Sequence, residues 1–154
     1  MLRALCVLAA TALSAGVGAT PLPDVDPILA GTKWVGTLSQ RGSFRGGAPA
    51  PPAFQAVLTV TRRHGDRFEA ELDEVAGPIR VTYVVKGVVT PAPVGQGHAV
   101  RFRSVGTTLA QSTVPVLDVP YDGVLRGRSL RGTWKAPGNG GTNVEGDFAL
   151  EMGR

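Results

Sequence analysis

Apolar and polar residues alternate along most of the chain beyond residue 50, and this period of two constrains the fold more than any other feature. In residues 53–60, Phe54, Ala56, Leu58 and Val60 lie on one side of an extended chain. Such alternation is typical of a β-strand that buries one face and leaves the other in solvent. It recurs in residues 67–74, 79–87, 98–104 and 144–152. The pattern therefore predicts several strands with one buried face each.

Turn-forming residues separate these stretches, with 21 glycines and 12 prolines in 154 residues. No stretch of ten or more residues after residue 19 has the 3.6-residue period of an amphipathic helix. Short strands at this spacing are typical of an all-β barrel or sandwich. We predict an all-β fold over residues 31–154: a single antiparallel up-and-down meander of about eight to ten strands, closed into a β-barrel. A sandwich is the alternative.

The register of the first long hairpin depends on the length of its turn. A three-residue loop at 64–66 would pair Val60 with Ala70 and Leu58 with Leu72, apolar against apolar. A two-residue turn would set Val60 against a glutamate and mix the two faces. We therefore predict the three-residue loop, with Thr61 opposite Glu69 and Thr59 opposite Glu71.

Residues 121–135, YDGVLRGRSLRGTWK, combine three arginines and a lysine with aromatic residues and leucines. A type II′ turn favours glycine at its first central position, which is Gly127 if the turn is Gly127-Arg128. The resulting pairs are Leu125 with Leu130, Gly123 with Gly132 and Tyr121 with Trp134. We expect a hairpin whose aromatic side chains point inward and whose arginines lie in solvent. A basic docking surface is the alternative.

Glycines stand beside aromatic residues on the inward face of several of these strands. Glycine inside a strand is costly, and it marks a bend, a bulge or a close approach. The alternative is that the missing side chains leave a cavity, because small barrels are either filled or hold one small ligand. The candidate ligand-binding residues are then Trp34, Gly36, Tyr83, Tyr121, Gly123, Gly132 and Trp134.

Residues 31–38, GTKWVGTL, followed by a meander of strands to the C-terminus, resemble the calycin superfamily, the lipocalins and their relatives. Its signature is Gly-x-Trp at the first strand. Here Gly31 and Trp34 are one residue further apart, whereas Gly132-Thr133-Trp134 has that spacing near the other end of the chain. The resemblance implies a lipocalin-like up-and-down barrel that binds a small apolar molecule in its interior.

The first 19 residues have the order of a secretory signal peptide. Arg3 precedes an apolar run over residues 4–13, and Val17-Gly18-Ala19 fits the small-x-small cleavage pattern. The run is too short to cross a bilayer, which needs about 20 apolar residues. We predict cleavage after Ala19, with Ala15 as the lesser option. Residues 20–30 would then form an extended N-terminal segment before the barrel domain, 31–154.

Cleavage would remove Cys6, the one cysteine of the chain, so the mature protein would have no disulfide. Animal secreted domains of this size usually carry disulfides. Together with 13 arginines against 3 lysines, this favours a bacterial protein that is periplasmic or secreted. A net charge of +4 is of a size that mainly favours solubility. Nucleic-acid binding would need the basic side chains gathered on one face. We expect no nucleic-acid partner.

Motifs that carry chemistry are missing from the sequence. It contains no Gly-x-Ser-x-Gly, no His-Glu-x-x-His and no phosphate-binding loop. His64 and His98 are far apart in the sequence, and residues 138–143, GNGGTN, read as a hairpin loop. We expect no catalytic residue, no metal and no cofactor, and a protein that is not an enzyme.

Two glycine- and proline-rich stretches, 41–52 and 106–120, read as long irregular loops. Long loops in compact domains are often functional. The leading hypothesis is an exported, monomeric, non-enzymatic barrel that binds a small apolar ligand. The alternative is a protein-interaction or inhibitor module that acts through these two loops. Insertion into a membrane is not expected, because charged residues occur at many levels of the polar face.

Overall fold

The computed structural model describes residues 26–43, 51–136 and 143–153, and these residues form strands, turns and short connections. The strands are β1 (Lys33–Ser39), β2 (Arg41–Ser43), β3 (Ala53–His64), β4 (Arg67–Ala76), β5 (Ile79–Thr90), β6 (His98–Gln111), β7 (Pro120–Arg126), β8 (Ser129–Lys135) and β9 (Asn143–Met152). The predicted signal peptide lies outside the described residues. So do residues 44–50 and 137–142.

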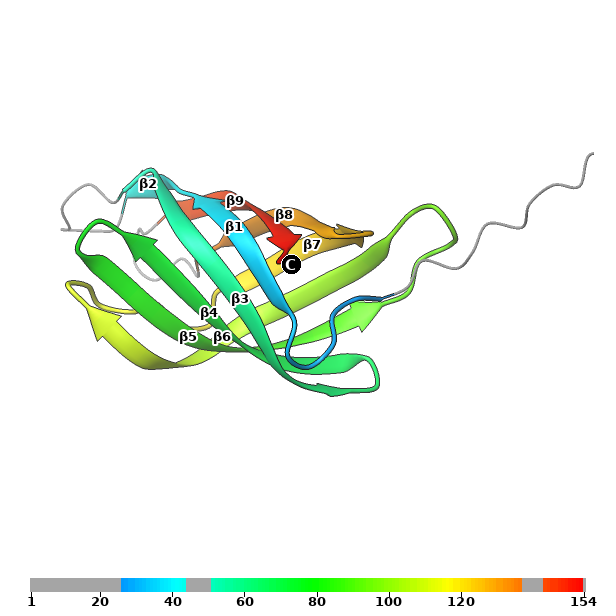
Figure 1. The fold of residues 1–154 in the computed structure, drawn as a ribbon. Helices are drawn as coiled ribbons and strands as arrows, with labels where there is room; N and C mark the ends of the chain where they lie inside the picture. Colours follow the sequence, from blue (N-terminus) through cyan, green and yellow to red (C-terminus); the bar gives the residue numbers. More distant parts are fainter. Residues whose placement is uncertain (1–25, 44–50, 137–142, 154) are drawn as a thin grey trace, which may run out of the picture.

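The strands form one antiparallel sheet that closes on itself (Figure 1). From β3 to β9 each strand pairs with the next along the chain, and β1 pairs with both β3 and β9. The short β2 continues β1 beyond Gln40 and also pairs with β9, so the two together occupy one position. The result is a closed eight-stranded up-and-down barrel, which confirms the predicted all-β fold.

The β3–β4 hairpin keeps the predicted core register but not the predicted turn. Val60 pairs with Ala70 and Leu58 with Leu72, and Thr59 pairs with Glu71, as expected. The predicted three-residue loop and the Thr61–Glu69 pair are wrong: His64 pairs with Arg67, which leaves a two-residue turn, and Arg62 pairs with Glu69.

A register shift between Val60 and Arg62 accounts for the difference, because it leaves Thr61 as an extra residue. A β-bulge adds one residue to one strand and so changes which side chains face inward beyond it. Pairing apolar residues with apolar residues in this hairpin requires one extra residue. That residue is Thr61, in the strand, and not a third residue in the turn.

The β7–β8 hairpin agrees with the sequence-based register at every pair. Tyr121 pairs with Trp134, Gly123 with Gly132 and Leu125 with Leu130. Gly127 has a φ of 55°, as the first central position of a type II′ turn requires. The aromatic side chains point inward and the arginines outward.

Buried side chains from every strand except β2 form one core inside the barrel. Trp34 and Leu58 are fully buried, and so is Ile28, which precedes β1 and lies within the predicted N-terminal segment. The predicted long loops are shorter than expected. Residues 41–43 belong to β2, residues 106–111 belong to β6, and Pro120 begins β7. The remainder of the second loop, residues 112–119, is called the strap below.

Candidate functional site

The inward glycines of β7 and β8 lie beneath the ring of Phe148. A methyl group added at Gly123 would come 2.8 Å from Cζ of Phe148, and one added at Gly132 would come 2.7 Å from it. A real Cβ does not approach another heavy atom so closely. The ring of Phe148 therefore fills the space that the missing side chains of these glycines leave. In other β-sheets too, an aromatic ring covers a glycine of the neighbouring strand.

Two further inward glycines, Gly36 and Gly146, lie where β1 and its continuation meet β9. An added methyl at Gly36 would come 2.9 Å from Cα of Leu150. At Gly146 it would come 2.7 Å from Nε1 of Trp134 and would also meet the backbone of Ser39. Both glycines permit the close approach of strands at the closure of the barrel.

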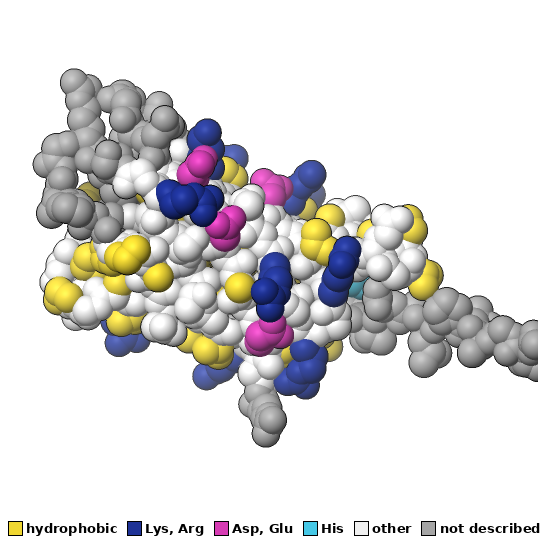
Figure 2. Space-filling view, turned by 90° about the horizontal axis from the view of Figure 1, so that it is seen from above, with side chains coloured by type: hydrophobic (Ala, Val, Ile, Leu, Met, Phe, Trp, Pro, Cys, Tyr) yellow, Lys and Arg dark blue, Asp and Glu magenta, His cyan; other side chains and the backbone are white. Residues whose placement is uncertain are grey.

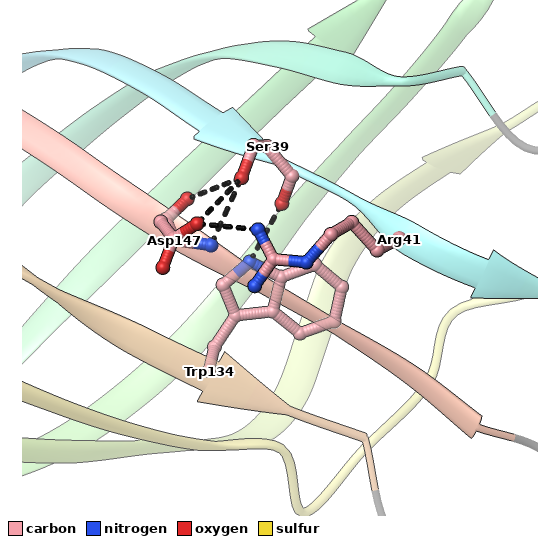
Figure 3. A network of polar contacts seen from close by, with 4 residues as sticks. All are labelled: Ser39, Arg41, Trp134 and Asp147. Carbon is pink, nitrogen blue, oxygen red and sulfur yellow. Dashed lines mark hydrogen bonds and ion pairs between the residues drawn. The ribbon is translucent and has the colours of Figure 1, made fainter.

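A polar network holds this closure together (Figure 3). The indole Nε1 of Trp134 donates to the carbonyl oxygen of Ser39 at 3.1 Å, and the backbone N–H of Asp147 donates to Oγ of Ser39 at 3.0 Å. Arg41 donates to Oδ2 of Asp147 at 2.6 Å. This hydrogen bond lowers the pKa of Asp147, but both side chains are exposed, so the pair adds little stability. The network is structural.

Aromatic rings fill the middle of the barrel. Tyr121 stacks on Phe102 with ring centroids 4.5 Å apart and an interplanar angle of 7°. Phe148 meets Phe102 edge-on at 5.7 Å, and Trp134 lies 6.3 Å from Tyr121. Such contacts stabilise beyond the area they bury. Trp34, which is fully buried, completes the filling.

One acidic side chain points into this interior. Glu74 continues the inward row of Phe68, Ala70 and Leu72 on β4, and only 9% of it is exposed. Its Oε1 accepts a hydrogen bond of 3.2 Å from the hydroxyl of Tyr121. Burial raises the pKa of Glu74 to about 7, partly offset by that hydrogen bond and reinforced by the charge of Asp73. The carboxyl group therefore holds its proton to a higher pH than an exposed glutamate does.

Two tyrosines face this carboxyl group from other strands. Burial, with the charge of Glu74 second, raises the pKa of Tyr83 to about 12 and that of Tyr121 well above its usual range. Both hydroxyls therefore keep their protons at any physiological pH. None of the ion pairs among the described residues includes Glu74, so no basic side chain there balances its charge.

The strap covers this end of the barrel. The backbone N–H of Val116 donates to the hydroxyl of Tyr83 at 3.4 Å, and Oγ of Ser104 donates to the carbonyl of Val116 at 3.5 Å. Ser104, fully buried, also accepts from the N–H of Val119 at 3.1 Å. Val116 packs against the core, whereas Val114 is 85% exposed. The middle of the strap is thus held to the barrel by two long hydrogen bonds and by the packing of the Val116 side chain.

The outer face of the barrel carries a shallow hollow of about 670 Å³ across β3 to β7. Charged side chains from two neighbouring rows line it, and these are largely paired with each other: Arg62 and Lys86 with Glu69, and Arg101 with Asp122. Its lining also includes Phe68, Phe102 and Tyr121, whose side chains belong to the core.

The arginines of the β7–β8 hairpin make local contacts. Arg128 donates to the carbonyl oxygen of Met152 at 2.9 Å, and Arg131 lies 3.3 Å from Glu151. Figure 2 looks down on the side where β7, β8 and β9 lie in Figure 1, and there basic and acidic side chains stand beside one another. This distribution gives the basic docking surface no support.

The structure divides the sequence-predicted ligand residues into two groups. Tyr83 and Tyr121 come together with Glu74, whereas Trp34 and the three glycines pack at the closure of the barrel and around Phe148. Trp134 belongs to both groups, because it bonds to Ser39 at the closure and lies beside Tyr121. Sequence reasoning missed Glu74 and Ser104. Their signal was present: each stands at an inward position of an alternating strand, where the pattern otherwise places apolar residues.

The described residues, 26–43, 51–136 and 143–153, contain neither a cluster of metal ligands nor a membrane-spanning helix. Within these ranges no three His, Cys, Asp or Glu side chains gather to hold a metal ion. In the same part of the chain, no helix has the length and apolar character to cross a bilayer. Comparison of the chain with protein-family models, with curated proteins and with solved structures gives no match.

Proposed function

We propose that this barrel is a non-enzymatic binding protein, and that a small, largely apolar molecule binds at the end closed by the strap. One observation carries this proposal: four polar side chains, those of Glu74, Tyr83, Ser104 and Tyr121, are buried together at one end of a largely apolar interior. An apolar site with a few convergent polar groups and a perturbed pKa is typical of ligand binding.

Entry of a ligand would require the strap to move. Opening its middle breaks the hydrogen bonds of Val116 to Tyr83 and Ser104, which are long at 3.4 and 3.5 Å, and withdraws one partly buried valine. The end of the strap at Asp118 and Val119 stays bonded to Ser104. Segments with few buried contacts open at the lowest free energy. The ligand would then take the place of Val116 and rest on Tyr83 and Tyr121. This proposed site keeps Tyr83 and Tyr121 from the seven candidate residues of the sequence analysis and adds Glu74 and Ser104.

A second candidate is contact with a protein partner through the outer side of the strap. It is favoured by Val114 and Leu117, apolar side chains that are 85% and 43% exposed above a filled core. This is the interaction-module hypothesis, confined to the second of its two loops. In either case we propose an exported monomer, released from a signal peptide after Ala19.

Matched substitutions on the two sides of the strap separate these candidates. Val116→Ser changes the side chain that faces the core, and Val114→Ser changes the one that faces solvent. Binding of decan-1-ol is followed through the aromatic ring signals of Tyr83 and Tyr121 by NMR, and native mass spectrometry of protein from its own host looks for a retained molecule.

For a site beneath the strap, decan-1-ol should shift both tyrosine signals, and Val116→Ser should change its affinity severalfold while Val114→Ser does not. A shift of Tyr121, which also lines the outer hollow, without a shift of Tyr83, which does not, would contradict the interior site, and so would no shift with wild-type protein. In that case the strap-contact candidate would remain.

A further inference from the structure

We propose that the ligand beneath the strap is an organic amine, bound as its ammonium ion against the carboxylate of Glu74. This inference rests on the proposed function and names the chemical class of its ligand. Three features of the described residues carry it: the uncompensated acid, the aromatic walls and the absence of any basic side chain at the cluster.

The acid is the first feature. The side chain of Glu74 is buried and forms one hydrogen bond, to Tyr121, although a carboxylate can accept about four. A buried charge is costly unless it is paired. A cation brought in by a ligand would provide the pairing that no ion pair among the described residues supplies.

The aromatic walls are the second feature. Tyr121, which donates to Glu74, lies in a stack with Phe102 and beside Trp134. Tyr83 faces Glu74 from β5. Faces of aromatic rings attract ammonium groups, most strongly where water is excluded. A carboxylate beside aromatic side chains suits an apolar amine better than a neutral lipid.

The surrounding charges are the third feature. The titratable groups that act on Glu74 are Asp73 beside it on β4, Tyr83 on β5 and Tyr121 on β7. On β3, the residue opposite Glu74 is Ala56. All of these groups are acidic or neutral, so an anionic ligand would meet repulsion and a cation would not.

Amine binding should be linked to the release of a proton. Burial raises the pKa of Glu74 to about 7, so below that pH the carboxyl group must lose its proton before it can pair with an ammonium ion. Affinity should fall as the pH is lowered below 7, by up to about tenfold per pH unit. An alcohol of the same length should show no such dependence.

The test compares hexylamine and octylamine with hexan-1-ol and octan-1-ol, using calorimetry at pH 6 and pH 8. The expected result is that at pH 8 each amine binds at least about tenfold more tightly than its alcohol, a difference that one ion pair can supply. At pH 6 each bound amine should release about one proton, measured from the heats in two buffers.

Two variants test whether Glu74 is the source of the preference for amines over alcohols. Glu74→Gln, which resembles the protonated acid in shape, should remove the preference for amines while alcohols still bind. Glu71→Gln removes an exposed carboxylate of the same strand and should leave the preference unchanged. Proton release is measured on the wild-type protein, so the test does not depend on the folding of Glu74→Gln.

The outcomes distinguish the two proposals. If alcohols and amines bind equally well to the wild-type protein, the amine inference is wrong and the proposed function stands. If neither class binds, both are wrong. If amines are preferred but Glu71→Gln removes the preference as much as Glu74→Gln does, the cation lies on the outer surface and the inference is again overturned.

Discussion

The hydroxyl of Tyr121 donates to Oε1 of Glu74 across the interior of the barrel, although the two residues are 47 positions apart in the chain. They come from β7 and β4, and in the sheet β5 and β6 lie between these strands. A contact of this kind exists only because the sheet closes. It places a buried acid against a buried phenol, and from this the first prediction follows.

The stability of the protein should fall as the pH rises from about 5 to about 8. The pKa of Glu74 is about 7 in the folded protein and 4.5 in its ordinary state, so the folded protein holds the proton more tightly. This tighter binding of the proton stabilises the folded state fully at pH values below 4.5, the ordinary pKa. The stabilisation is lost as the pH rises through about 7, the pKa in the folded protein. The loss is up to about 3 kcal/mol, measured from urea midpoints.

Glu74→Gln is the informative variant for this pH dependence, because it cannot ionise and should flatten the profile between pH 5 and pH 8. Glu71→Gln is the control and should retain the slope. Asp73 and Asp147 have lowered pKa values, so they change the stability only at pH values near and below their ordinary pKa of 3.8, which is outside this window. A wild-type profile that is flat from pH 5 to pH 8 would show that Glu74 is ionised in the folded protein.

Gly123→Ala should destabilise the protein by roughly 1–3 kcal/mol, because the added methyl would overpack the core. It would meet Cζ of Phe148 at 2.8 Å and the carbonyl oxygen of Arg131 at 2.9 Å. Gly106→Ala, on β6, is the matched control, since no atom lies within 4 Å of its added methyl. Equal thermal midpoints for the two variants would mean that space for a ligand surrounds Gly123 after all.

Trp134→Ala should lower the free energy of unfolding by roughly 3–5 kcal/mol, as the loss of a large buried aromatic side chain does. The variant also leaves the carbonyl oxygen of Ser39 without its indole donor. The neighbouring Lys135→Ala removes an exposed side chain and should stay within about 0.5 kcal/mol of wild type. Chemical denaturation measures both, and a small effect at Trp134 would contradict the inward register of β8.

Ile28→Ala should destabilise the protein by roughly 2–5 kcal/mol, although Ile28 precedes the first strand. Its side chain is fully buried, and the backbone N–H of Ile28 is bonded to Asp26, which pairs with Arg63 at 2.6 Å. Leu29→Ala changes an exposed neighbour and serves as the control. If both variants melt at the wild-type temperature, the segment before β1 does not belong to the core.

Protein recovered from the cell envelope or the medium should begin at Thr20, because residues 1–19 have the charged, apolar and small-residue order of a signal peptide. N-terminal sequencing of the mature protein checks this directly. An intact Met1 on exported protein would rule out cleavage after Ala19.

The sequence by itself determined which residues of the strands face inward and which face outward, except beyond the bulge of β3, and it determined the register of the β7–β8 hairpin. It could do so because the direction of a side chain alternates along a strand and a two-residue turn links neighbouring positions. Both are local properties, carried by residues such as Leu125 and Leu130. The alternation also placed Tyr83 and Tyr121 in the interior, which is half of the candidate site.

Only the tertiary structure decided the other half. The bulge at Thr61, the Phe148 ring over Gly123 and the meeting of Glu74 with Tyr121 all depend on how far the strands shift and coil as the barrel closes. In sequence, Glu74 reads as one more acid in an acidic strand, because local alternation does not show what lies across the interior. The closure of the sheet brings β7 to face β4, and the exclusion of water there turns an ordinary carboxylate into a buried acid with a raised pKa.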